Sequence, residues 1–241
     1  MPRFFLDSVE GDTLTVTGQD AVHIRRSLRM TVGERLTVCD GRGTECACVI
    51  EGFPGEDVVL TVTARGAAES EPTCAVTLYQ GLPKGDKMEW IIQKAVELGV
   101  TRIVPVQMAR CVAVLNEKGR ADKKTARWQK IADEAAGQSG RGILPVVEAP
   151  LSFKEAAARL EGEYTLVCYE GGGEPFATLA GRDTAAVSLV IGPEGGIDPA
   201  EIRRLTEGGA RIATLGRRIL RCETAPLAAL AVLMAVTGNM E

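Results

Sequence analysis

The stretch LVIGPEGGIDPAEIRRLTEGGARIATLGRRILRCET, residues 189–224, decides how this chain folds. Two apolar runs typical of strands, residues 187–191 and 210–215, each break at glycine and lead into a helix. Open α/β sheets bind ligands in the loops at the carboxyl ends of their parallel strands. We therefore expect these two loops to form a ligand site.

The helices that follow the two loops carry start signals. Asp198 is placed to cap the first helix, Pro199 suits its first position, and Glu201 completes a capping box. Thr224 is expected to cap the second helix, and that helix, TAPLAALAVLMAV, is apolar almost all the way round. A helix of this kind must be buried on most sides, within its own domain or against a second copy of the chain.

The chain from residue 73 onward alternates between strand and helix patterns. Expected strands cover residues 74–81, 100–108, 144–149 and 164–169, and expected helices cover 87–98, 123–136 and 153–161, the last capped by Ser152. Such alternation is typical of an α/β domain with a parallel sheet. We assign residues 73–241 to this domain.

Residues 1–70 have a different pattern, with short runs rich in threonine and valine. Strands are expected at residues 3–7, 13–18, 34–41, 44–52 and 57–64. One helical segment, residues 21–30, has Val22, Leu28 and Ile24 on one side and arginines on the other. A small β-barrel with one helix fits, followed by a polar linker over residues 67–72.

Composition excludes several classes of protein. A net charge of −4 argues against a protein that coats nucleic acid, so an RNA-binding role needs local basic clusters. No apolar run reaches the roughly 18 residues of a membrane span, and the start lacks the apolar core of a signal peptide. Seven cysteines without a CxxC pair, and one histidine, predict reduced cytoplasmic thiols and no metal site.

The glycine loops lack the usual nucleotide-binding and hydrolase motifs, since GxxxxGK[ST], GxGxxG and GxSxG are all absent. We interpret the glycines at 171–173 as a tight turn. The other loops predict a pocket of backbone amides and apolar side chains, edged by arginine and glutamate, that suits a flat base with a partly apolar tail. The candidate ligand-binding residues are Ile191, Gly192, Gly195, Gly196, Leu215, Gly216, Ile219, Leu220 and Thr224.

Blocks along nearly the whole chain resemble the RsmE family. They are QGLPKGDKMEWIIQKAVELGV at 80–100, IGPEGGID at 191–198 and LGRRILRCETAPLAAL at 215–230, with shorter matches at residues 2–5, 23–30, 40–43 and 137–141. The resemblance implies a SPOUT-class methyltransferase that uses S-adenosylmethionine to methylate N3 of a uridine in 16S ribosomal RNA. It also implies a PUA-like β-barrel followed by an α/β domain with a deep trefoil knot.

The chain departs from the family pattern in three places. Family members often have Ser-Glu-Arg-Ser where this chain has residues 108–111, a histidine pair where it has Val22 and His23, and threonine where it has Cys222.

Methyl transfer to uridine N3 needs the imide proton removed and the developing charge stabilised. Near the glycine loops, Glu194 and Glu223 are the candidate bases, and Arg221, with Arg218 behind it, is the candidate donor. A loop carboxylate that shapes a turn, or one that favours a helix N-terminus, is the alternative role for each glutamate. The sequence does not decide which group is the base.

We expect the RNA to contact basic residues on both domains, with the target base splayed into the pocket. The candidates are Arg3, Arg25, Arg29, Lys84, Lys87 and Arg141. A homodimer formed through the last helix is also expected. Two alternatives remain at this point: a non-catalytic RNA-binding protein, and a SPOUT enzyme that methylates the ribose 2′-oxygen.

Overall fold

The computed structural model describes residues 1–112 and 118–241, with side chains described outside 113–120. The chain divides into two compact units. The first contains residues 1–71 and 136–144, and the second contains residues 72–135 and 145–241. A segment from the middle of the chain therefore belongs to the N-terminal unit, which the sequence pattern did not indicate.

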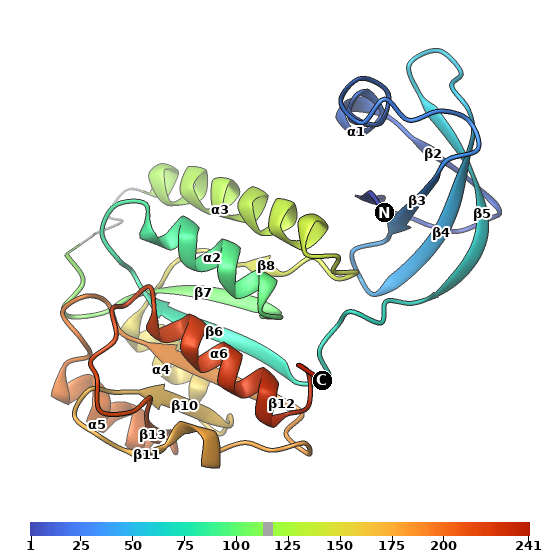
Figure 1. Ribbon diagram of the computed structural model, residues 1–241. Helices are drawn as coiled ribbons and strands as arrows, with labels where there is room; N and C mark the ends of the chain where they lie inside the picture. Colours follow the sequence, from blue (N-terminus) through green and yellow to red (C-terminus); the bar gives the residue numbers. More distant parts are fainter. Residues whose placement is uncertain (113–117) are drawn as a thin grey trace. The chain divides into compact units, whose positions relative to one another are not determined.

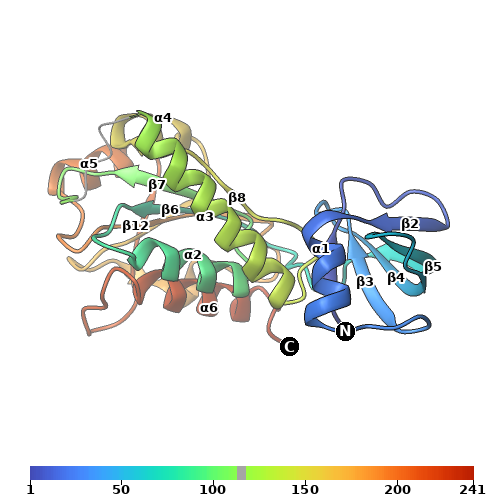
Figure 2. The same cartoon turned by 90° about the horizontal axis from the view of Figure 1, so that it is seen from above.

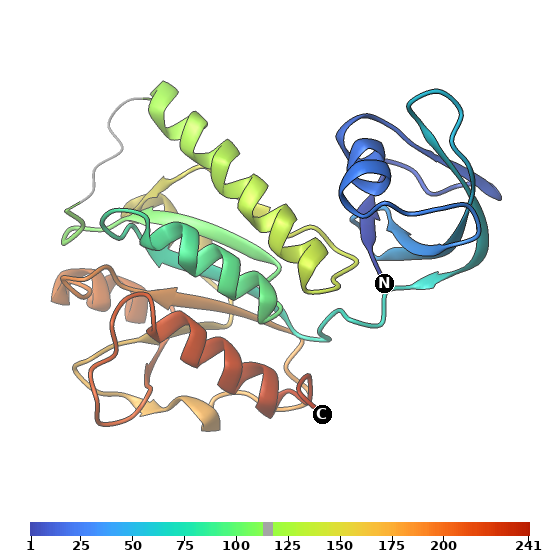
Figure 3. The same ribbon diagram turned by 45° about the horizontal axis from the view of Figure 1, so that its top comes forward.

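The N-terminal unit is built on a curled five-stranded sheet (Figure 3). Its strands in spatial order are β1 (Arg3–Phe5), β3 (Arg35–Cys39), β4 (Thr44–Gly52), β5 (Val58–Ala67) and β2 (Thr13–Val16). All pairs are antiparallel except β1 with β3. Two register shifts between β4 and β5 add local twist, which helps the long strands to curl around their core.

The helical segment of this unit packs differently from the expectation. It consists of α1 (Gly18–Val22) and a π-helical turn (His23–Ser27). Ile24 is fully buried, whereas Val22 and Leu28 are about two-fifths exposed at 42% and 40%. The expectation that Val22, Leu28 and Ile24 share one side of a helix is therefore wrong, because the π turn at residues 23–27 breaks the helical spacing on which it rested.

The C-terminal unit contains one parallel sheet. In the order β11-β13-β10-β12-β6-β7-β8, every pair of neighbours runs in parallel, and β9 pairs with β7. The strands are β6 (Ala75–Gly81), β7 (Arg102–Gln107), β8 (Val146–Val147), β9 (Leu151–Ser152), β10 (Thr165–Cys168), β11 (Glu174–Pro175), β12 (Ala186–Ile191) and β13 (Arg211–Thr214).

Helices cover both faces of this sheet (Figures 1 and 2). On one face α2 (Lys87–Glu97) lies beside α6 (Ala225–Val236), and on the other α4 (Phe153–Leu160) contacts α5 (Pro199–Glu207). The remaining helices are α3 (Lys118–Gln138) and a short 3₁₀ turn, η2 (Phe176–Thr178). Central strands are buried on both faces, so β12 reads as an almost continuous apolar run.

Start signals predicted two of the helices correctly. Asp198 and Glu201 form the capping box of α5 with Pro199 in its first turn, and Ser152 and Glu155 form that of α4. Thr224 does precede α6, but its side chain makes no capping hydrogen bond. The α3 helix begins at Lys118 and ends at Gln138, so it is longer than the predicted 123–136 at both ends.

Candidate functional site

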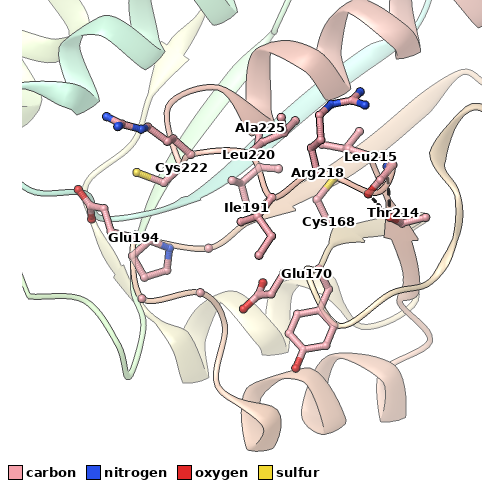
Figure 4. A pocket seen from close by; sticks show the side chains of 18 of the residues that line it. Cys168, Glu170, Ile191, Glu194, Thr214, Leu215, Arg218, Leu220, Cys222 and Ala225 are labelled. Atoms are coloured by element: carbon pink, nitrogen blue, oxygen red, sulfur yellow. Dashed lines mark hydrogen bonds between the residues drawn. The ribbon is translucent and has the colours of Figure 1, made fainter.

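A pocket of about 580 Å³ lies at the carboxyl ends of β10, β12 and β13 (Figure 4). Three segments line it, residues 168–170, 191–196 and 214–222, together with Lys87 and Ala225. The volume falls within the range of roughly 300–1,000 Å³ that small-molecule sites occupy. Each wall follows directly from a parallel strand, so the topology alone brings the three loops to one edge of the sheet.

Glycines shape the first wall, residues 192–196, because side chains there would collide with neighbouring segments. A Cβ on Gly192 would come within 2.8 Å of Ile197, and one on Gly195 within 3.0 Å of the Arg110 side chain. Arg110 also donates to the Gly195 carbonyl at 3.2 Å and pairs with Asp198 at 3.4 Å. Arg110 therefore ties the glycine loop to the first turn of α5, a role that the sequence analysis did not identify.

The second wall, residues 214–222, turns at Gly216, whose φ of +105° few other residues adopt. Leu215 and Leu220 are half-buried and face the pocket, but Ile219 is 84% exposed at its rim. Thr224 does not line the pocket, because it lies one residue before α6 with its side chain in solvent. The expectation that Thr224 contacts the ligand is therefore not supported.

The third wall was missed by the sequence analysis, which named only the glycines at 171–173. Those glycines do pack as a tight turn: a Cβ on Gly171 would overlap the Tyr169 ring, and one on Gly173 the backbone of Ile212. The pocket is lined instead by the three residues before them, Cys168, Tyr169 and Glu170. The signal that could have located this wall is its place at the end of an apolar strand.

Lys87 joins the two glutamates that the sequence analysis named as candidate bases. Its Nζ lies 3.1 Å from a carboxylate oxygen of Glu194 and 3.1 Å from one of Glu223. The Lys84 backbone N–H also donates to Glu194, at 3.1 Å, and the Cys222 thiol to Glu223, at 3.2 Å. One ammonium group thus links the glycine loop to the segment before α6.

Electrostatics makes both carboxylates weak bases. Burial opposes ionisation of Glu194, but hydrogen bonds from its own N–H, from Lys84 and from Lys87 outweigh it and lower its pKa. The pKa of Glu223 is lowered in the same way, against burial, by Cys222, its own N–H and Lys87. Burial, followed by Glu223, raises the pKa of Cys222 to about 12, so this thiol stays protonated.

The candidate donor Arg221 lies on the pocket wall and is exposed, as is Arg218. Among residues 1–112 and 118–241, neither guanidinium has a hydrogen-bond or ion-pair partner. Two positive charges at the pocket are therefore available to a ligand or substrate.

The six candidate RNA contacts fall into different environments. Arg141 is only 3% exposed and pairs with Glu71 at 2.6 Å, so the expectation that it contacts RNA is contradicted. Arg3 pairs with Glu45 at 2.7 Å, and only 13% of its side chain is exposed, so it is also poorly placed to contact RNA. Lys87 is engaged at the pocket, as described above.

The remaining three are accessible. Arg25 donates to the Gly55 carbonyl and lies over the Phe53 ring while half-buried, and Lys84 is exposed. Arg29 is exposed and is the one non-glycine residue with positive φ, +55°, in the described part of the chain. That conformation is uncommon and marks positions that are often functional.

Two further observations concern the part of the chain that the structure describes. Within the described residues, no three His, Cys, Asp or Glu side chains come together as a metal site would need. In the same part of the chain, every helix is too short or too polar to cross a bilayer.

Two family models match the chain. Residues 69–234 match an RNA methyltransferase domain, and residues 16–62 match an RNA methyltransferase PUA domain. The first range covers most of the parallel-sheet unit together with residues 69–71 and 136–144 of the curled-sheet unit, and the second range lies within the curled-sheet unit.

Curated relatives and solved structures are similar over almost the full length. The ribosomal RNA small subunit methyltransferase E of Bacillus subtilis is 38% identical, over 97% of this chain and 96% of that protein. The Mycobacterium tuberculosis protein of the same name is 33% identical, over 99% and 93%. Two similar solved structures contain bound S-adenosylmethionine. The structure from Neisseria gonorrhoeae has a TM-score of 0.87 and 33% identity, over 98% of this chain and 97% of that one. The structure from Legionella pneumophila has a TM-score of 0.84 and 30% identity, over 97% of this chain and 96% of that one.

Proposed function

This chain belongs to the ribosomal RNA small subunit methyltransferase E family, and we propose on that basis that it transfers a methyl group from S-adenosylmethionine to N3 of a uridine in 16S ribosomal RNA. The observation that supports this most is the pocket itself, with three strand-end loops around about 580 Å³ and the cations of Arg217, Arg218 and Arg221 on its wall. We further propose that the protein acts in the cytoplasm and that its partner is the small ribosomal subunit or the RNA of that subunit.

The pocket walls suit a nucleoside cofactor. Apolar side chains of Ile191, Leu215 and Leu220 offer faces for a flat base, and the residues 192–196 and Gly216 bring the backbone N–H and C=O groups close to it. When bound, S-adenosylmethionine supplies a methyl group activated by a positively charged sulfur.

The chain's own contribution to the reaction is positive charge and positioning. Arg221 holds the negative charge that develops over O2, N3 and O4 of the uracil as the N3 proton leaves. Glu194 and Glu223, with lowered pKa values and a shared Lys87, hold two pocket loops together rather than abstract the proton. Proton loss to water then needs no carboxylate base, since Arg221 itself favours the uracil anion.

We divide the roles between residues 1–70, which bind RNA, and residues 73–241, which bind the cofactor and perform the transfer. Arg29 in the first range and Lys84 in the second are exposed cations and support contact with RNA, and Arg25 is a half-buried cation beside Phe53 in the first range. Family membership also supports the trefoil knot, which stays a prediction.

A homodimer is proposed from the outer side of α6. Leu227, Ala228, Ala231 and Val232 are only partly buried, so the apolar helix is not covered within one chain. On the neighbouring α2, Trp90 is 52% exposed. A second copy of the chain would cover these groups.

The decisive experiment is incubation of the protein with labelled S-adenosylmethionine and either small ribosomal subunits or 16S RNA, followed by mass analysis of nucleosides. We expect 3-methyluridine. A 2′-O-methylated nucleoside would indicate the ribose-methylating alternative. RNA binding without any methylation, and without cofactor binding by calorimetry, would indicate the non-catalytic one and overturn the proposal.

A further inference from the structure

Glu170 reaches the pocket from the wall that sequence analysis missed. It follows β10 by two residues, at the carboxyl end of the sheet. Its side chain is directed into the pocket beneath Ile191 (Figure 4). Across the residues that the structure describes, its carboxylate makes no hydrogen bond or ion pair.

The first glycine loop leaves room for this carboxylate. Gly196 has a φ of +71°, and a Cβ there would overlap Glu170 Oε1 and lie 3.1 Å from its Cδ. The Gly196 N–H does not satisfy the carboxylate, because it donates to the Pro193 carbonyl at 2.9 Å. The loop therefore accommodates a group that only accepts hydrogen bonds and that has no donor from the protein.

The charges of the pocket are separated between its walls. Arg217, Arg218 and Arg221 all lie on the segment 214–222, whereas Glu170 lies on the wall opposite Arg218 (Figure 4). The carboxylate of the cofactor's amino-acid end is attracted to Arg217 and Arg218, which leaves Arg221 for the uracil. The group that faces Glu170, beside the apolar Ile191, is then the nucleoside.

We infer that Glu170 binds the 2′- and 3′-hydroxyls of the cofactor's ribose and thereby selects a ribonucleoside. This inference rests on the proposed function and names a contact within that site. A diol presents two O–H donors to one carboxylate, and carboxylates at strand ends bind ribose hydroxyls in dinucleotide folds by the same chemistry. Glu170 is exposed at the pocket, so its unpaired acceptor is open to such a ligand, and Gly196 leaves the carboxylate the room that it occupies.

Calorimetry with three probes tests the inference: S-adenosylhomocysteine, its 2′-deoxyribose analogue, and 5′-methylthioadenosine, which keeps the diol but lacks the amino acid. In the wild type, the deoxy analogue should bind more weakly than S-adenosylhomocysteine. Glu170→Ala and Glu170→Gln should weaken S-adenosylhomocysteine and methylthioadenosine alike, by roughly 10- to 100-fold, the range expected for hydrogen bonds to a charged group. The same substitutions should reduce the affinity for the deoxy analogue by a smaller factor.

The matched control is Glu174→Ala, which removes a carboxylate four residues further on that pairs with Arg211 outside the pocket. It should leave all three affinities unchanged. Wild-type affinity of Glu170→Gln for S-adenosylhomocysteine would overturn the inference. If a Glu170 variant binds methylthioadenosine as the wild type does but binds S-adenosylhomocysteine more weakly, the inference is overturned, because Glu170 would then contact the ammonium group of the cofactor's amino acid. If the wild type binds none of the probes, the proposed function itself fails.

Discussion

Lys87 illustrates how one side chain shapes this site. It begins α2, yet its ammonium group is shared by Glu194, from the glycine loop, and Glu223, from the segment before α6. The two carboxylates raise the pKa of Lys87, and Lys87 helps to lower theirs. At neutral pH the three groups remain charged and hold the loops in place.

Replacing Lys87 should change how stability depends on pH. The pKa values of Glu194 and Glu223 are lowered from 4.5, so their stabilisation is complete above pH 4.5 and is lost as the pH falls through the folded-state values. We expect Lys87→Met to lower the unfolding temperature at neutral pH and to converge with the wild type in acid. Thermal unfolding from about pH 3 to pH 7 measures this. A gap that persists unchanged at the acid end would contradict the ion-pair explanation.

Arg221 should act on the reaction more than on cofactor binding. We expect Arg221→Ala to lower kcat by about 100- to 1,000-fold, as the loss of one donor to a developing anion does elsewhere. Affinity for S-adenosylhomocysteine should stay close to that of the wild type. The control is Arg204→Ala, an exposed arginine of α5 paired with Glu161. Equal losses of kcat in both variants would remove Arg221 from the proposed chemistry.

At the scale of elements, two capping boxes stabilise the starts of two helices that lie in different surroundings. Ser152 caps α4 away from the pocket, and Asp198 caps α5 directly after the glycine loop. Asp198 also pairs with Arg110, which holds the Gly195 carbonyl. The start of α5 therefore belongs both to the helix and to the pocket wall.

Removing each cap separates these two roles. Asp198→Ala and Ser152→Ala should each lower the free energy of unfolding by about 1 kcal/mol in denaturant titrations. Only Asp198→Ala should also weaken binding of S-adenosylhomocysteine, because it releases Arg110 and the glycine loop. Equal affinities in the two variants would show that the cap does not position the pocket wall.

The outer side of α6 predicts the oligomeric state. Ala231→Glu should produce a monomer in sedimentation experiments, since a carboxylate cannot be buried unpaired in an apolar interface. Trp90→Ala should raise the dissociation constant of the dimer by about 30-fold, as loss of 2 kcal/mol at a hot spot would. Arg203→Glu on the exposed side of α5 is the control. A wild type that is monomeric at micromolar concentration would rule out this dimer.

At the scale of the whole molecule, Arg141 and Glu71 link two distant segments within the N-terminal unit. Glu71 Oε1 also accepts hydrogen bonds from the N–H groups of Gly142, at 2.9 Å, and Ile143, at 3.0 Å. Beside them, Leu144 donates its N–H to the Gly41 carbonyl at 3.0 Å. The unit is therefore completed by residues 136–144, which begin 65 residues after its first segment ends at residue 71.

Breaking this pair should cost more than any surface substitution. Glu71→Ala leaves a buried guanidinium without its carboxylate and should destabilise the N-terminal unit by roughly 3–5 kcal/mol. The double variant Glu71→Gln with Arg141→Met should lose less free energy of unfolding than Glu71→Ala, because it leaves no charge buried. Chemical unfolding followed by a probe in residues 1–71 compares them. A double variant as unstable as the single one would mean that the pair acts through shape, not charge.

Local sequence by itself determined most elements of this protein. The capping residues of α4 and α5, the apolar runs of β6, β10 and β12, and the glycine loops at residues 192–196 and 216 all follow from contacts within a few residues. Such features do not need the rest of the fold. For this reason the parallel sheet and the place of the pocket were predicted correctly.

Only the tertiary structure decided which charges are free and which residues form the third wall. The burial of Arg141, the sharing of Lys87 and the inward direction of Glu170 each depend on segments that lie 70 or more residues away or on a neighbouring strand. The sequence alone does not distinguish a paired arginine or glutamate from an unpaired one. Its role is set by the partners that the fold brings to it, because pairing and burial are properties of contacts between distant parts of the chain.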